Sequence, residues 1–255
     1  MSAATMDKAL FEFLCRMGDN TLVLGHRVSE WCGHAPVLEE DIALANMSLD
    51  LIGQTQLWLG LAGEIEGKGR SADDFAYLRD AFDFRNLLLV EQPNGDFGKT
   101  LMRQFLFDGF QSVMLEQLAI SKNERVREIA QKVAKEVSYH LERSSDLVVR
   151  LGDGSQESHQ RMQAALEDLW PYVGEMFLDE AEDAVLADAG IAPQPSSLKT
   201  AWDELMLPLL GKACLEVPES GYFQKGGKRG THSEHLGFIL AEMQFLQRAY
   251  PGATW

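Results

Sequence analysis

Positive charge is scarce in this chain. Its 255 residues include 23 Lys and Arg against 39 Asp and Glu, which gives a formal net charge of −16. Binding to nucleic-acid phosphates requires clustered basic side chains, so this charge balance excludes a nucleic acid as the partner. It also disfavours docking on an anionic membrane surface. Hydrophobic residues make up 45% of the chain and charged residues 24%, which are values typical of globular proteins.

Cysteines and long apolar runs are also few. Cys15, Cys32 and Cys214 form no C-x-x-C pair, so we expect free, mostly buried thiols in a reducing compartment. The N-terminal residues lack the pattern of a secretory signal. Apolar runs such as Leu87–Val90 are far shorter than the roughly 20 residues that span a bilayer. These absences predict a cytoplasmic protein with no membrane partner.

What the sequence does contain is apolar residues at helical spacing. An all-α fold follows, with four long core helices and accessory ones in a single domain, residues 1–255. A first helix should end near Gly33, and others are predicted near residues 38–60, 100–120, 124–151, 158–170, 198–209 and 232–250. On the helix at 38–60, the stripe predicted to face the core consists of Ile42, Ala45, Leu49, Ile52 and Leu59.

Large helical bundles often hold two iron ions, which requires a Glu-x-x-His pair on each of two helices. None of the six histidines has a Glu or Asp three residues before it. His140 lies on the apolar side of its helix, but Val137 occupies the position where a carboxylate ligand would be. We therefore predict no metal site and a buried polar pair, Glu136 and His140. The alternative is a metal site with unorthodox ligands such as Asp50, Glu116, Glu136 and His140.

Other catalytic motifs are absent. The chain has no G-x-S-x-G turn, no G-x-x-x-x-G-K-[ST] phosphate loop and no G-x-G-x-x-G after a strand. No catalytic or cofactor-binding residue is therefore assigned.

The segment from Lys225 to His232, called the basic segment below, is rich in basic residues and contains no acidic residue. Thr231 and Glu234 at its end form a capping-box pattern, which predicts a helix starting after Thr231. Free N–H groups at such a helix start can bind an anion, such as a phosphate of CoA or an acidic partner protein. The alternative is a flexible, solvated loop. The residues predicted to make this contact are Lys225, Lys228, Arg229 and His232.

Several exact blocks, occurring in order from about residue 14 onward, resemble the family of C subunits of phenylacetyl-CoA epoxidase. The blocks are Gly-Asp-Asn-Thr-Leu-Val-Leu (18–24), Glu-Trp-Cys-Gly-His-Ala-Pro (30–36), Asp-Ile-Ala-Leu-Ala-Asn-Met-Ser-Leu-Asp-Leu-Ile-Gly-Gln (41–54), Asn-Leu-Leu-Leu-Val-Glu-Gln-Pro-Asn-Gly-Asp-Phe (86–97), Thr-His-Ser-Glu-His-Leu-Gly (231–237) and Ala-Glu-Met-Gln-Phe-Leu-Gln-Arg (241–248).

The resemblance implies a ferritin-like bundle that serves as a non-catalytic structural subunit of a bacterial oxygenase complex. In that family the A subunit holds the di-iron centre and binds phenylacetyl-CoA. A reductase subunit with flavin and an iron–sulfur cluster delivers electrons from NADPH. The ring is converted to an epoxide, which opens aerobic phenylacetate degradation. The implied partners are the A subunit, other subunits of the complex and a further copy of this chain.

Two other functions stay open from the sequence. One is a self-sufficient ferritin-like di-iron oxygenase with the unorthodox ligands named above. The other is an accessory module that binds CoA through the basic segment. The lack of any Glu-x-x-His pair favours the structural subunit over the oxygenase.

Overall fold

A computed structural model describes residues 3–219 and 221–253. These residues form helices, turns and loops without a strand, which confirms the prediction of an all-α fold. They divide into two compact units: unit 1 is Met1–Pro93 with Lys225–Trp255, and unit 2 is Asn94–Gln224. The single domain stays a prediction, and each unit is described by itself. In the described part of the chain, no helix is long and apolar enough to cross a membrane.

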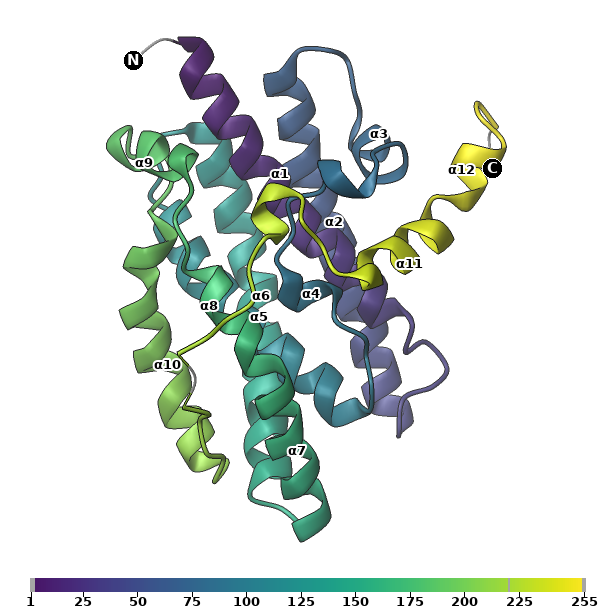
Figure 1. Cartoon of the computed structure of the whole chain (residues 1–255), viewed down its shortest axis with the longest axis vertical. Helices are drawn as coiled ribbons and strands as arrows, with labels where there is room; N and C mark the ends of the chain where they lie inside the picture. The colour runs from purple at the N-terminus through teal and green to yellow at the C-terminus, as the bar shows by residue number, and fades with distance from the viewer. Residues whose placement is uncertain (1–2, 220, 254–255) are drawn as a thin grey trace. The chain divides into compact units, whose positions relative to one another are not determined.

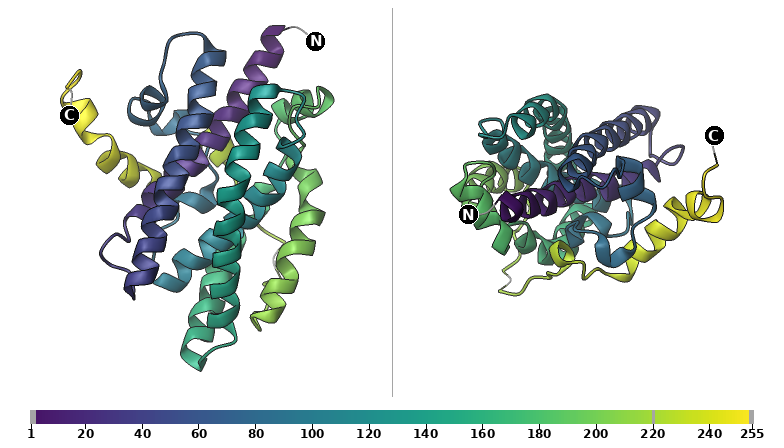
Figure 2. Two further views of the ribbon diagram at one scale, coloured as in Figure 1. Left: turned by 180° about the vertical axis from the view of Figure 1, so that it is seen from behind. Right: turned by 90° about the horizontal axis from the view of Figure 1, so that it is seen from above.

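Unit 1 is built on a pair of long helices that run side by side in opposite directions (Figures 1 and 2). Small residues let them approach closely. A Cβ added at Gly18 would lie 2.5 Å from the Leu59 side chain, and one at Gly25 would lie 3.3 Å from the Cβ of Leu51. The helices are α1 (Ala3–Ser29) and α2 (Leu38–Glu66).

Hydroxyl groups bind the same two helices together. The Thr21 and Thr55 hydroxyls share a hydrogen bond of 2.9 Å, and the Ser48 hydroxyl donates to the Gly25 carbonyl at 2.8 Å. Each buried hydroxyl therefore has a partner, as buried polar groups require.

The predicted core stripe of α2 is wrong. Ile42 and Leu49 are exposed, by 53% and 70%, and Leu59 alone of the five predicted residues is fully buried. Apolar residues occur on more than one side of this helix, so periodicity alone could not choose between them. The side that packs inward is Leu44, Met47, Leu51, Gln54, Thr55 and Trp58.

The rest of unit 1 consists of short elements. Ser233, and not Thr231, caps α11, because the Ser233 side chain accepts from the backbone N–H of His235. The predicted helix 232–250 is also interrupted at Gln244. The elements are α3 (Ala72–Tyr77), η1 (Ala81–Asp83), α4 (Leu88–Glu91), η4 (Gly227–Arg229), α11 (Glu234–Met243) and α12 (Phe245–Ala249).

Unit 2 confirms the helices expected near 100–120 and 124–151. Asp96 caps α5 through the Lys99 N–H, and Asn123 caps α6 through the Val126 N–H. Pro171 follows the end of α7, where its missing backbone N–H cannot continue the helical hydrogen bonds. The elements are α5 (Phe97–Leu118), α6 (Glu124–Gly152), α7 (Gln156–Leu169), η2 (Trp170–Tyr172), α8 (Val173–Met176), α9 (Ala181–Asp188), η3 (Pro195–Leu198) and α10 (Lys199–Lys212).

The three cysteines are free, as predicted. The prediction that most of them are buried is wrong, because two of the three are exposed. Only Cys15 is buried, in α1, whereas Cys32 and Cys214 lie in turns after α1 and α10. Burial is the largest of the causes that raise the pKa of the Cys15 thiol.

Candidate functional site

A cluster of polar side chains lies inside unit 2, between α5 and α6. Asp108 is completely buried, and both of its carboxylate oxygens accept hydrogen bonds. The Gln104 amide donates to Oδ1 at 2.6 Å, and the Ser144 hydroxyl donates to Oδ2 at 2.9 Å. His140 is equally buried, one helical turn before Ser144 on α6.

Burial raises the pKa of the Asp108 carboxyl to about 6. His140, the hydrogen bonds from Ser144 and Gln104, and Arg143 act in the opposite direction, because each favours the ionised form. The carboxyl therefore changes protonation state near neutral pH.

The structure places the Asp108 carboxylate, on the neighbouring helix, in electrostatic interaction with His140. Glu136 is half-buried one turn before His140, and its pairing with His140 stays a prediction.

The alternative ligand set is divided between the two units. Asp50 belongs to α2 in unit 1, whereas Glu116, on α5 in unit 2, is exposed. Across residues 3–219 and 221–253, no three His, Cys, Asp or Glu side chains come together as they would to hold a metal ion. Asp108 and His140 are too few for a di-iron centre, which needs four carboxylates and two histidines.

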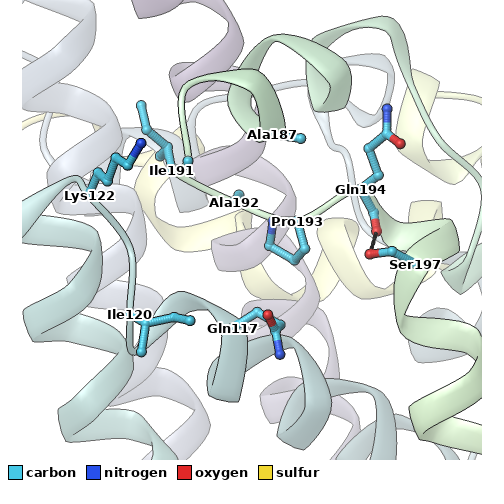
Figure 3. A pocket seen from close by; sticks show the side chains of 10 residues that line it. Gln117, Ile120, Lys122, Ala187, Ile191, Ala192, Pro193, Gln194 and Ser197 are labelled. Carbon is cyan, nitrogen blue, oxygen red and sulfur yellow. Dashed lines mark hydrogen bonds between the residues drawn. The ribbon is translucent and has the colours of Figure 1, made fainter.

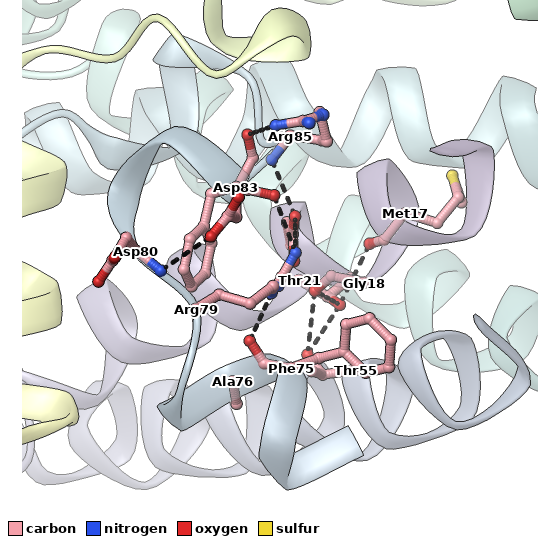
Figure 4. A network of polar contacts seen from close by, with 12 residues as sticks. Met17, Gly18, Thr21, Thr55, Phe75, Ala76, Arg79, Asp80, Asp83 and Arg85 are labelled. Atoms are coloured by element: carbon pink, nitrogen blue, oxygen red, sulfur yellow. Dashed lines mark hydrogen bonds and ion pairs between the residues drawn. The ribbon is translucent and has the colours of Figure 1, made fainter. Parts of the chain in front are cut away.

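Unit 1 has a buried ion pair between Asp19 of α1 and Arg79, which follows α3. Figure 4 shows Arg79 among its neighbours Phe75, Asp83 and Arg85. The Arg79 guanidinium contacts both Asp19 oxygens and donates to the carbonyls of Phe75 and Asp83 at 2.6 and 3.1 Å. Asp19 also accepts from the Arg85 N–H at 2.8 Å. The pair thus holds the segment around η1 against α1, which is a structural role.

Within unit 1, the basic segment packs against Glu91, whose side chain is completely buried. Glu91 accepts from the Ser233 N–H at 2.8 Å and from the Asn86 amide at 3.1 Å. His232 places Nδ1 3.1 Å from Glu91 and Nε2 3.1 Å from the Phe84 carbonyl. Both ring nitrogens therefore lie within hydrogen-bonding distance of an oxygen of unit 1.

This arrangement changes the prediction for the four basic residues. Lys228 is 9% exposed and His232 is turned inward, so only Lys225 and Arg229 are exposed. One of the N–H groups at the start of α11, that of Ser233, is bound to Glu91. The alternative, a flexible solvated loop, does not describe this segment either. Its backbone packs so closely at Gly227 that an added Cβ would lie 2.1 Å from the Asn86 carbonyl oxygen.

Unit 2 also has an open groove of about 470 Å³ (Figure 3). Its lining combines apolar residues such as Ile120 and Pro193 with the amides of Gln117 and Gln194, and Lys122 is the charged member of the lining. One ammonium group is a weak basis for binding the several phosphates of CoA.

Comparison with known proteins identifies the family. All of residues 1–255 match the family described as "Phenylacetic acid catabolic protein". The chain belongs to the phenylacetic acid catabolic protein family. Among its relatives, the C subunit of 1,2-phenylacetyl-CoA epoxidase from Escherichia coli (strain K12) is 44% identical over 246 residues, which cover 96% of this chain and 99% of that protein. The resemblance and the ferritin-like helical fold expected from it are confirmed.

In this member of the phenylacetic acid catabolic protein family, the sequence did not identify Asp108 and Glu91 as buried carboxylates. Asp108 left a signal: with Gln104 it places two polar residues four positions apart in a helix rich in Phe and Leu. Glu91 left none, because two of its partners, Ser233 and His232, are about 140 positions away.

Proposed function

We propose that this chain is a non-catalytic structural subunit of a multicomponent phenylacetyl-CoA epoxidase. It would support a di-iron catalytic subunit in aerobic phenylacetate degradation, in the cytoplasm. The di-iron centre would belong to that partner, and flavin, iron–sulfur cluster and NADPH to a reductase subunit. The similarity to the C subunit of such an epoxidase supports this assignment.

The observation that carries the proposal is the chemistry of the buried cluster on α5 and α6. Where a Glu-x-x-His helix would present its carboxylate, α6 presents the buried side chain of Val137. The carboxylate that does reach the interior, Asp108, already accepts hydrogen bonds from Gln104 and Ser144. The donor set therefore does not fit a di-iron centre, and the cluster serves to fill and align the helices.

Reconstitution tests the proposal. Purified chain is assayed for iron and then titrated into the purified catalytic subunit, with reductase and phenylacetyl-CoA present. We expect substoichiometric iron in this chain and epoxidation that depends on its addition. Two iron ions per chain, or full activity of the catalytic subunit alone, would overturn the structural role.

The CoA-binding module receives less support. Lys225 and Arg229 are exposed and could contact an acidic group, but the neighbouring backbone N–H of Ser233 already donates to Glu91. Equilibrium dialysis with CoA separates the two functions. Binding by the isolated chain that disappears in Lys225→Glu/Arg229→Glu would favour the accessory module.

A further inference from the structure

The exposed side of α2 carries a regular apolar seam. Its residues are spaced by four, three, four and three positions, which is the spacing of a and d positions in a coiled coil. Leu38, Ile42 and Leu49 are 71%, 53% and 70% exposed, whereas Ala45 and Ile52 are half-buried. We define these five residues, Leu38, Ile42, Ala45, Leu49 and Ile52, as the α2 seam.

The geometry of the α2 seam indicates the shape of what covers it. Scattered exposed apolar residues are normal on a protein surface and need no partner. A strict a/d stripe is narrower than the core face of a globular helix and fits another helix lying lengthwise. From Leu38 to Ile52 the seam spans about 21 Å, or roughly four helical turns.

The charge along α2 indicates the chemistry of that helix. No Lys or Arg occurs between residues 28 and 67, whereas Glu39 and Asp41 lie at the flanks of the seam. A second copy of α2 would bring the same two carboxylates against these, which like-charge repulsion disfavours. A helix with Lys or Arg beside its apolar stripe complements the seam.

We propose that the α2 seam binds an amphipathic helix with basic flanks, contributed by the catalytic subunit of the epoxidase. This proposal rests on the proposed function, since it takes the partner from the same assembly. The α2 seam supplies shape and apolar contact, and the acidic residues beside it select a basic partner over a second copy of this chain.

The test is a titration of full-length chain with the purified catalytic subunit at two salt concentrations. The seam variant is Ile42→Ser/Leu49→Ser. Its matched control is Ile120→Ser/Tyr139→Ser, which removes two exposed apolar residues from unit 2. All four side chains are exposed in the chain itself, so far-UV circular dichroism and thermal unfolding should show folded proteins.

We expect the seam variant to bind at least about tenfold more weakly, and the control to bind as the original chain does. Glu39→Gln should weaken binding mainly at low salt. Equal binding by the seam variant and its control would overturn the proposal and leave the proposed function intact. A seam variant that loses self-association but keeps the catalytic subunit would also overturn it. Failure of the unmodified chain to bind the catalytic subunit would overturn both.

Discussion

Replacing Asp108 by Asn should make the protein relatively more stable as the pH rises. The side chain keeps its size and can still accept from Gln104, but it no longer places a charge in the interior of unit 2. Burial raises the pKa of this carboxyl from 3.8 to about 6, and one pKa unit corresponds to 1.36 kcal/mol. Ionised Asp108 therefore costs roughly 3 kcal/mol of stability at pH 8.

The direction of this change in stability with pH follows from the number of protons that each state binds. Between about pH 4 and 6 the folded chain keeps the Asp108 proton that the unfolded chain has released, so the stability of the original chain falls through this range and levels off above pH 6. The Asn side chain does not titrate. The free energy of unfolding of Asp108→Asn minus that of the original chain should increase by roughly 1.5 kcal/mol between pH 5 and pH 8.

Urea unfolding of both proteins at pH 5, 6, 7 and 8, followed by circular dichroism, measures this difference. Asp146→Asn is the control, because Asp146 is an exposed residue of α6 whose loss should give a nearly constant difference. A difference for Asp108→Asn that stays flat or falls with pH would refute the reasoning. A falling difference would mean that the folded protein favours the ionised carboxylate, and a flat one that burial does not shift its pKa.

The remaining predictions concern unit 1 and the thiols. Asp19→Ala leaves the buried guanidinium of Arg79 without its carboxylate and should cost about 3–5 kcal/mol in urea unfolding. Gly227→Ala drives a methyl group into backbone, so the basic segment should be cut faster in limited trypsin digestion. A thiol reagent should modify the two exposed cysteines of the native chain, and Cys15 only after denaturation, as counted by mass spectrometry.

Matched variants accompany these experiments. Asp80→Ala removes an exposed partner of Arg248 and should cost under about 1 kcal/mol. Gly237→Ala adds a Cβ that meets nothing within 4 Å, so digestion should be unchanged. Equal losses for Asp19→Ala and Asp80→Ala, equal digestion of the two glycine variants, or labelling of Cys15 in the native chain would each contradict the corresponding prediction.

Sequence patterns predicted the parts of the fold that depend on neighbours along the chain. The helix at α6 was predictable because its apolar residues lie mainly on one side. The buried side of α2 was not, because apolar residues occur on several sides and only the packing of α1 selects among them. The cap of α11 was misplaced for a similar reason, since Thr231 and Ser233 are both good N-cap residues.

The candidate site was predictable to the same degree. The lack of Glu-x-x-His could be read directly, and His140 was correctly placed in the interior. Its partner Asp108 lies on another helix, and the Glu91 contacts join segments distant in sequence. Such contacts depend on tertiary packing, which periodicity and spacing do not encode.

The division of unit 1 into two stretches has a consequence for synthesis on the ribosome. Residues 94–224 are contiguous, so unit 2 can fold as soon as its own chain has emerged. Unit 1 cannot, since the buried Glu91 carboxylate waits for Ser233 and His232, made some 140 codons later. Until then unit 1 of the nascent chain lacks its C-terminal stretch. This stage is where we expect chaperones to bind and premature termination to cause aggregation.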